Sequence, residues 1–66
     1  MYTIKPLEHL LIDRGMTKKQ LYEGTGLSKT TMDRLTRGED ARISTIDRIC
    51  QFLKAPIEQV IEIVPD

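Results

Sequence analysis

Basic and hydroxyl side chains recur at helical spacing in the middle of the chain. Lys29 and Arg34 carry cationic donors suited to the O6 and N7 acceptors of guanine, and the methyl group of Thr30 can contact that of thymine. Asp33 and Arg37 share the same helical face, at spacings of one, three and four residues. A short helix with such a face fits the major groove of B-DNA. The pattern therefore predicts base contacts from Lys29, Thr30 and Arg34.

A second group of residues is suited to phosphate, because it offers cations or hydroxyl donors without a base-reading geometry. Phosphate contacts fix the position of a protein on the duplex but carry no sequence information. The first turn of a helix expected at Ser44 adds backbone amides, which attract anions. The predicted phosphate contacts are Thr17, Lys18, Thr31, Arg37, Arg42 and Ser44.

Asp33 is the acidic residue of this face and a poor neighbour for phosphate. Three roles are open for its carboxylate: an ion pair with Arg37 at i+4, a hydrogen bond from a cytosine amine, or repulsion of wrong sites.

Two short helices joined by a tight turn must position these side chains, within residues 17–38. Thr17 and Gln20 have the spacing of a capping box, so the first helix is expected to begin near Lys18. It is expected to end at Gly26, because a residue without a β-carbon adopts the left-handed C′ conformation without steric cost.

The second helix is expected to start after Ser28, a second N-cap, and to run to Arg37 before Gly38. Its inner face and the first helix must bury their apolar residues against each other and against the rest of the chain. These residues are Leu21, Leu27, Met32 and Leu35.

Residues 18–37 resemble the helix-turn-helix of the phage Cro and repressor type, also called XRE-like. The family pattern has leucine at its fourth position, glycine at its ninth and aliphatic residues at its tenth, fifteenth and eighteenth, matched here by Leu21, Gly26, Leu27, Met32 and Leu35. Ser28 matches the polar residue before the recognition helix, and Arg37-Gly38 matches the pair that closes it. The resemblance implies a DNA-binding regulator whose usual base-reading positions are occupied by Lys29, Thr30 and Arg34.

Two positions depart from the family pattern. Tyr22 replaces the usual alanine at the fifth position, where the two helices touch, so either the helices splay or the ring lies along their edge. Lys18 replaces the common glutamine at the first position. A lysine holds phosphate as a point charge but cannot pair with adenine as an amide does, which favours a backbone contact.

Three further helices are predicted around the motif. The first starts at Pro6 and continues to Gly15. The second has a capping box in Ser44 and Asp47, and it buries a stripe at i, i+3, i+4 and i+7 formed by Ile46, Ile49, Cys50 and Leu53. The third is a short helix from Pro56 to about Val60, with Ile57, Val60 and Ile61 available for burial.

The terminal segments have strand character, because residues 1–5 alternate and residues 61–66 are β-branched. We expect them to pair as a two-stranded ribbon, whose free edge is a natural contact for a second copy. The predicted fold class is thus an all-α, five-helix, repressor-like helix-turn-helix domain over residues 1–66, with a small terminal β-ribbon.

The charge distribution favours a nucleic-acid partner, although ten basic and ten acidic residues give zero net charge. From Arg14 to Arg42, seven cations stand against four acids, so this part carries +3. The segment before it carries −1 and the segment after it carries −2.

The remaining composition excludes several classes of protein. One cysteine and one histidine supply neither a disulfide framework nor a zinc ligand set, so Cys50 is interpreted as a buried small hydrophobe and His9 as a surface residue. No apolar run is long enough for a membrane span, and no signal-peptide pattern is present. We expect a cytoplasmic protein that is not an enzyme and that has no cofactor, metal or small-molecule ligand.

The predicted function is sequence-specific binding of double-stranded DNA by a small transcriptional regulator, in particular a repressor, which dimerises through its terminal strands. The alternative is a helix-turn-helix module that binds a protein partner, of the antirepressor or antitoxin kind. Zero net charge and Lys18 are the observations that favour this alternative.

Overall fold

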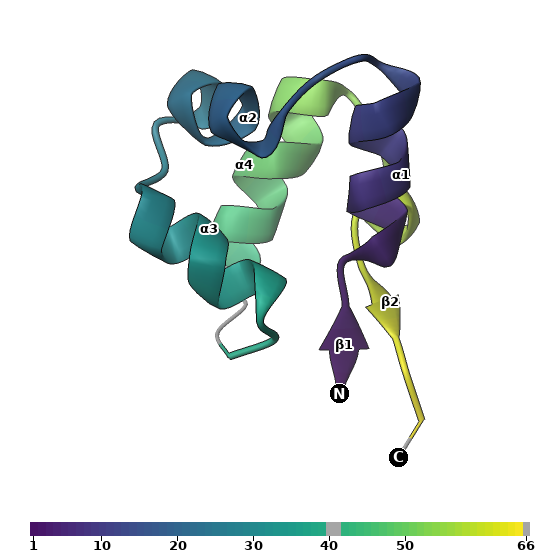
Figure 1. Cartoon of the computed structure of the whole chain (residues 1–66). Helices are drawn as coiled ribbons and strands as arrows, with labels where there is room; N and C mark the ends of the chain where they lie inside the picture. The colour runs from purple at the N-terminus through teal and green to yellow at the C-terminus, as the bar shows by residue number, and fades with distance from the viewer. Residues whose placement is uncertain (40–41, 66) are drawn as a thin grey trace.

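Four α-helices, one 3-10 turn and a two-stranded ribbon make up the described part of the fold (Figure 1). The computed structural model describes residues 1–39 and 42–65. In chain order the elements are β1 (Tyr2–Thr3), α1 (Lys5–Asp13), α2 (Lys18–Thr25), α3 (Lys29–Thr36), α4 (Ile43–Leu53), the 3-10 helix η1 (Ile57–Gln59) and β2 (Glu62–Ile63). Asp40, Ala41 and Asp66, the last of which was predicted to belong to a strand, lie outside the described residues.

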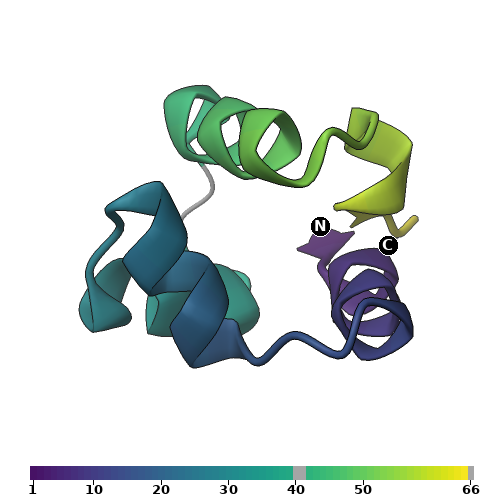
Figure 2. The same cartoon turned by 90° about the horizontal axis from the view of Figure 1, so that it is seen from above.

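One apolar cluster holds the helices together. Figure 2 shows α4 on one side of the molecule, facing the α2–α3 pair and α1 on the other. The cluster between them takes residues from all four helices and consists of Ile4, Leu7, Leu11, Leu21, Met32, Leu35, Ile46, Ile49, Leu53, Ala55 and Val60. Among the residues of the motif that were predicted to be buried, Leu27 is only partly buried and packs against this cluster. Tyr22 is also partly buried and packs against the same cluster.

The start and end of α2 are those expected from the sequence. Thr17 Oγ1 accepts from the Gln20 backbone N–H at 3.1 Å, and the Thr17 N–H donates to Gln20 Oε1 at 2.9 Å, so the capping box is complete. Gly26 ends the helix in the left-handed conformation, with φ of 79°.

Phe52 of α4 fixes a close approach between α2 and α4. A β-carbon added to Gly24 would lie 2.5 Å from Cζ of Phe52, well inside van der Waals contact. Gly24 therefore lets the aromatic ring lie directly over the last turns of α2. This contact adds to the buried Leu21, Ile46 and Ile49 in setting the position of the motif on α4.

The predicted five-helix count is wrong, because the last predicted helix is a single 3-10 turn, Ile57–Gln59. Val60 follows this turn fully buried, and its carbonyl accepts from the Leu7 N–H at 3.2 Å. That contact draws the chain back to α1 before a second turn forms. Of the three residues offered for burial there, only Val60 is fully buried, whereas Ile61 is half-buried and Ile57 is exposed.

The predicted capping box of Ser44 and Asp47 is also wrong. Helix α4 begins at Ile43, two residues before the position set by a Ser44 N-cap, and no side chain caps it. The carbonyl of Arg42 accepts from the N–H groups of Thr45 and Ile46, so Ser44 lies within the first turn. Cys50 is partly exposed rather than buried.

The predicted terminal ribbon is present. β1 and β2 pair antiparallel, with Tyr2 opposite Ile63 and Thr3 opposite Glu62. The Tyr2 hydroxyl donates to the Leu35 carbonyl at 3.2 Å, which ties the ribbon to the end of α3. The ribbon is shorter than the segments 1–5 and 61–66 from which it was predicted.

Candidate nucleic-acid interface

The turn between α2 and α3 orients the second helix of the motif. The Leu27 N–H donates back to the Tyr22 carbonyl at 2.9 Å, so the chain reverses within the three residues after α2. Ser28 Oγ then accepts from the Thr31 N–H at 3.1 Å, which starts α3 as predicted. Both ends of the turn are thus fixed by local hydrogen bonds.

Helix α3 has one buried face and one exposed face. Met32 and Leu35 are buried in the cluster, and this anchors the helix. The exposed face consists of Lys29, Thr30, Asp33, Arg34 and Arg37. The side chains of Lys29, Thr30 and Arg34, the three predicted base contacts, are therefore all exposed to solvent. They lie on a helix that the core holds in place.

A polar hollow of about 170 Å³ lies between α3 and the start of α4. Its lining brings together Thr31 and Arg34 of α3 with Arg42, the N-cap of α4, and it adds Thr45 of α4. The Arg42 guanidinium and the two threonine hydroxyl groups, beside a helix start without a side-chain cap, suit an anion such as phosphate, and Arg34 borders the hollow from the exposed face of α3. Sequence reasoning missed Thr45, although its place in the first turn of α4 next to Ser44 was an available signal.

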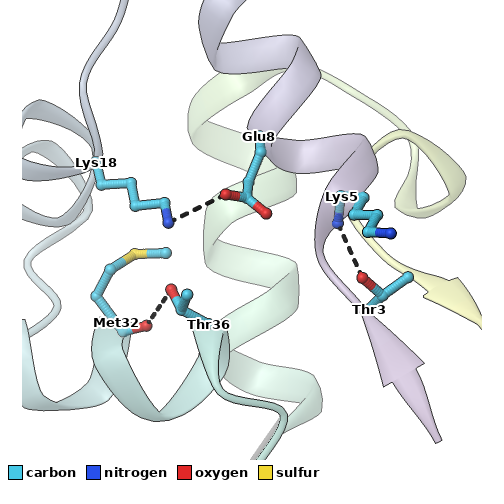
Figure 3. Close-up of polar contacts among 6 residues, drawn as sticks. All are labelled: Thr3, Lys5, Glu8, Lys18, Met32 and Thr36. Carbon is cyan, nitrogen blue, oxygen red and sulfur yellow. Dashed lines mark hydrogen bonds and ion pairs between the residues drawn. The ribbon is translucent and has the colours of Figure 1, made fainter.

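Lys18, one of the predicted phosphate contacts, forms an ion pair within the chain. Its Nζ lies 3.2 Å from Oε2 of Glu8 on α1, and Figure 3 shows this ion pair beside Met32 and Thr36 of α3. The two side chains are 39% and 41% exposed, so water screens the pair. A phosphate at Lys18 would have to compete with Glu8.

Arg37 pairs with Glu39, with Nη2 and Oε2 3.5 Å apart. The first of the three roles considered for Asp33, an ion pair with Arg37, is therefore not the one that the structure has. Within residues 1–39 and 42–65, ion pairs engage Lys18 and Arg37 but neither Lys29 nor Arg34. Lys29 and Arg34 of α3 therefore face solvent without an ion-pair partner among these residues.

The hydroxyl groups of Thr17 and Thr31 already have partners in the chain. Thr17 Oγ1 accepts the cap hydrogen bond at 3.1 Å, and Thr31 Oγ1 lies 2.9 Å from Ser28 Oγ. A threonine hydroxyl has one donor and two acceptor sites, so the Thr17 hydroxyl keeps its donor for a phosphate oxygen. Ser44 is exposed in the first turn of α4.

Residues 1–39 and 42–65 contain no group of three or more His, Cys, Asp and Glu side chains that could hold a metal ion. Nor is any helix in this part of the chain long and apolar enough to cross a bilayer.

A short helix anchored by its inner face, preceded by a second helix across a tight turn and bearing cations outward, defines a helix-turn-helix module. The family model of the Cro/C1-type HTH DNA-binding domain matches residues 6–66. The chain belongs to this family of DNA-binding domains.

Among solved structures, the chain is similar to the one described as the crystal structure of transcriptional regulator VanUg, Form II. The two share 34% sequence identity with a TM-score of 0.92, over 98% of this chain and 87% of the other. A comparison with curated proteins found no match.

Proposed function

We propose that the chain binds specific sequences in double-stranded DNA and regulates transcription, most directly as a repressor that occupies its site. The single observation that carries this proposal is the exposed face of α3, where Lys29, Thr30 and Arg34 lie outward while Met32 and Leu35 hold the helix in the core. Membership of a DNA-binding family and similarity to a solved transcriptional regulator support it.

Within this proposal, the side chains divide into two roles. Lys29, Thr30 and Arg34 contact base edges in the major groove. Backbone phosphates are held on both sides of α3 and fix the register. The proposed phosphate contacts are Thr17, Lys18, Thr31, Arg37, Arg42 and Ser44, to which the hollow between α3 and α4 adds Thr45.

We further propose that residues 1–66 act as one DNA-binding unit that functions as a homodimer. A two-fold dimer of such a module reads two half-sites about one helical turn, roughly 34 Å, apart. Selection of bound fragments from a random duplex library is expected to return a near-palindrome. A single unpaired site would contradict the dimeric proposal.

The assignment of roles is tested by comparing Arg34 of α3 with Arg37, the C-cap of that helix. Arg34→Ala is expected to cost about 1 to 3 kcal/mol and to relax preference at one base pair, whereas Arg37→Ala is expected to weaken all sequences alike. The measurement is fluorescence anisotropy on the selected site and on each of its single-base variants. Equal losses on every duplex from both variants would contradict the division between base and phosphate contacts.

The alternative, a helix-turn-helix module that binds a protein partner, is favoured by the ion pair that occupies Lys18 and by the zero net charge. Anisotropy on random duplexes at low and physiological salt separates the two functions. DNA binding driven by phosphate contacts weakens steeply with salt. Absence of binding at low salt would refute the DNA-binding proposal and favour the protein partner.

A further inference from the structure

The exposed face of α3 carries one acidic residue, Asp33, among three cations and a threonine. Arg37, four residues further along the chain, pairs with Glu39 at 3.5 Å rather than with Asp33. Lys29, four residues earlier, forms no ion pair within residues 1–39 and 42–65. Within the same residues, no hydrogen bond or ion pair engages the Asp33 carboxylate. Both of its oxygens are therefore available to accept from a ligand.

Asp33 has the same access to the outside of the molecule as Arg34. Successive residues of an α-helix are about 100° apart around the helix axis. The buried side chains of Met32 and Leu35 fix the inward direction of α3. Asp33 and Arg34 then lie about 50° to either side of the opposite, outward direction. A helix that turns Arg34 toward base edges therefore presents Asp33 to the same groove.

A carboxylate at this place needs a hydrogen-bond donor from the DNA. Phosphates carry negative charge and would repel it. Entry of α3 into the groove removes water from the side chain, and a charged group that loses water without gaining a hydrogen bond weakens binding. The donors that base pairs offer in the major groove are the N4 amine of cytosine and the N6 amine of adenine.

The surroundings of these two amines favour cytosine. Adenine N6 lies between two acceptors, which are N7 of the same base and O4 of the paired thymine. Cytosine N4 has only one such neighbour, O6 of the paired guanine. An ionised carboxylate is an acceptor without a donor, so it meets less repulsion at cytosine than at adenine.

We propose that Asp33 is a further specificity-determining residue, which accepts a hydrogen bond from N4 of a cytosine in the major groove. This role rests on the proposed function and adds an acidic contact to the three base contacts proposed there. DNA without the cytosine is bound more weakly, because the carboxylate then loses water and finds no donor.

Selection of bound duplexes from a random library, carried out in parallel with the native chain and two Asp33 variants, tests the proposal. Asp33→Asn keeps the size of the side chain but adds donors, and asparagine pairs with N6 and N7 of adenine. Native sites are expected to have cytosine at one position where Asp33→Asn selects adenine and Asp33→Ala selects no base. In anisotropy titrations, the native chain should prefer cytosine there by about 5- to 150-fold, and Asp33→Ala should lose this preference.

Asp13→Asn is the matched control, because it makes the same chemical change at an exposed aspartate of α1, which Figure 1 shows apart from α3. This variant is expected to select the native sites. Circular dichroism of all three variants should match that of the native chain, since both aspartates are exposed.

The outcomes separate this inference from the proposed function. Native base preferences in both Asp33 variants would overturn the inference, and so would a change of preference from a base other than cytosine. Tighter binding of every duplex by Asp33→Asn, with no change of preferred base, would reduce the role of Asp33 to repulsion and would also overturn it. In each of these cases the native chain still selects a site, so the proposed function stands. A native chain that selects no site would overturn the proposed function, and this inference with it.

Discussion

Replacing Glu8 with glutamine should strengthen DNA binding by removing the acid that competes for Lys18. The carboxylate oxygen lies 3.2 Å from Lys18 Nζ in the free protein. Glutamine keeps the length and hydrogen-bonding capacity of the side chain but not its charge. Lys18 would then be available to a phosphate without first giving up an ion pair.

The expected magnitude follows from the exposure of the pair. With both side chains about two-fifths exposed, an ion pair of this kind contributes at most about 1 kcal/mol. Its removal should thus tighten Kd by about two- to fivefold near 0.1 M salt. If Lys18 gains a phosphate contact that it lacks in the native protein, the slope of log K against log salt should steepen by up to about 0.9.

Anisotropy titrations of one duplex at several salt concentrations measure both quantities. Glu58→Gln is the matched control, because it makes the same charge change on η1, at an acid without an ion pair among the described residues. The double variant Glu8→Gln with Lys18→Ala should lose the gain. An unchanged or weaker affinity in Glu8→Gln would refute the reasoning and show that Glu8 positions Lys18 for phosphate. An equal gain in Glu58→Gln would assign the effect to net charge.

Two further predictions concern α4. Gly24→Ala should leave the free energy of unfolding nearly unchanged in the native background, because displacing the Phe52 ring offsets the helix-propensity gain of about 1 kcal/mol. In a Phe52→Ala background, the same substitution should show the full gain. Urea unfolding of the native chain, the two single variants and the double variant measures this, and additive effects would contradict the contact. Burial is the main cause that raises the pKa of the Cys50 thiol, and the negative charge of Asp47 is the second cause. Alkylation of Cys50 at pH 8 should therefore be slower in the folded chain than in urea. Equal alkylation rates would contradict this prediction.

The local features of the motif were predictable because short-range signals fix them. The Thr17–Gln20 box, the Gly26 cap and the Ser28 cap each involve groups within three or four residues, and all three occur as expected. The terminal ribbon was predictable for a different reason, since only two segments of the chain have strand character. In both cases the sequence offered no competing arrangement.

Two predictions from local signals were wrong, and the structure shows a distant contact behind the second of them. Ser44 and Asp47 have the spacing of a capping box, yet α4 starts at Ile43. Pro56 can start a helix, but burial of Val60 against α1 limits it to one 3-10 turn. The Glu8 ion pair and the Thr45 side of the hollow join separate elements, so spacing along the chain could not predict them.

The placement of acids on this neutral chain bears on how it would discriminate among DNA sites. Glu8 and Glu39 pair with Lys18 and Arg37 at the two ends of the motif, whereas Lys29 and Arg34 on α3 have no such partner among the described residues. Pairing at the ends reduces the charge available for phosphates, which drive binding to any sequence. The unpaired cations lie where base edges would be read. Such a distribution of charge would reduce the non-specific affinity for DNA more than the specific affinity. The ratio of specific to non-specific affinity decides whether a regulator finds its site.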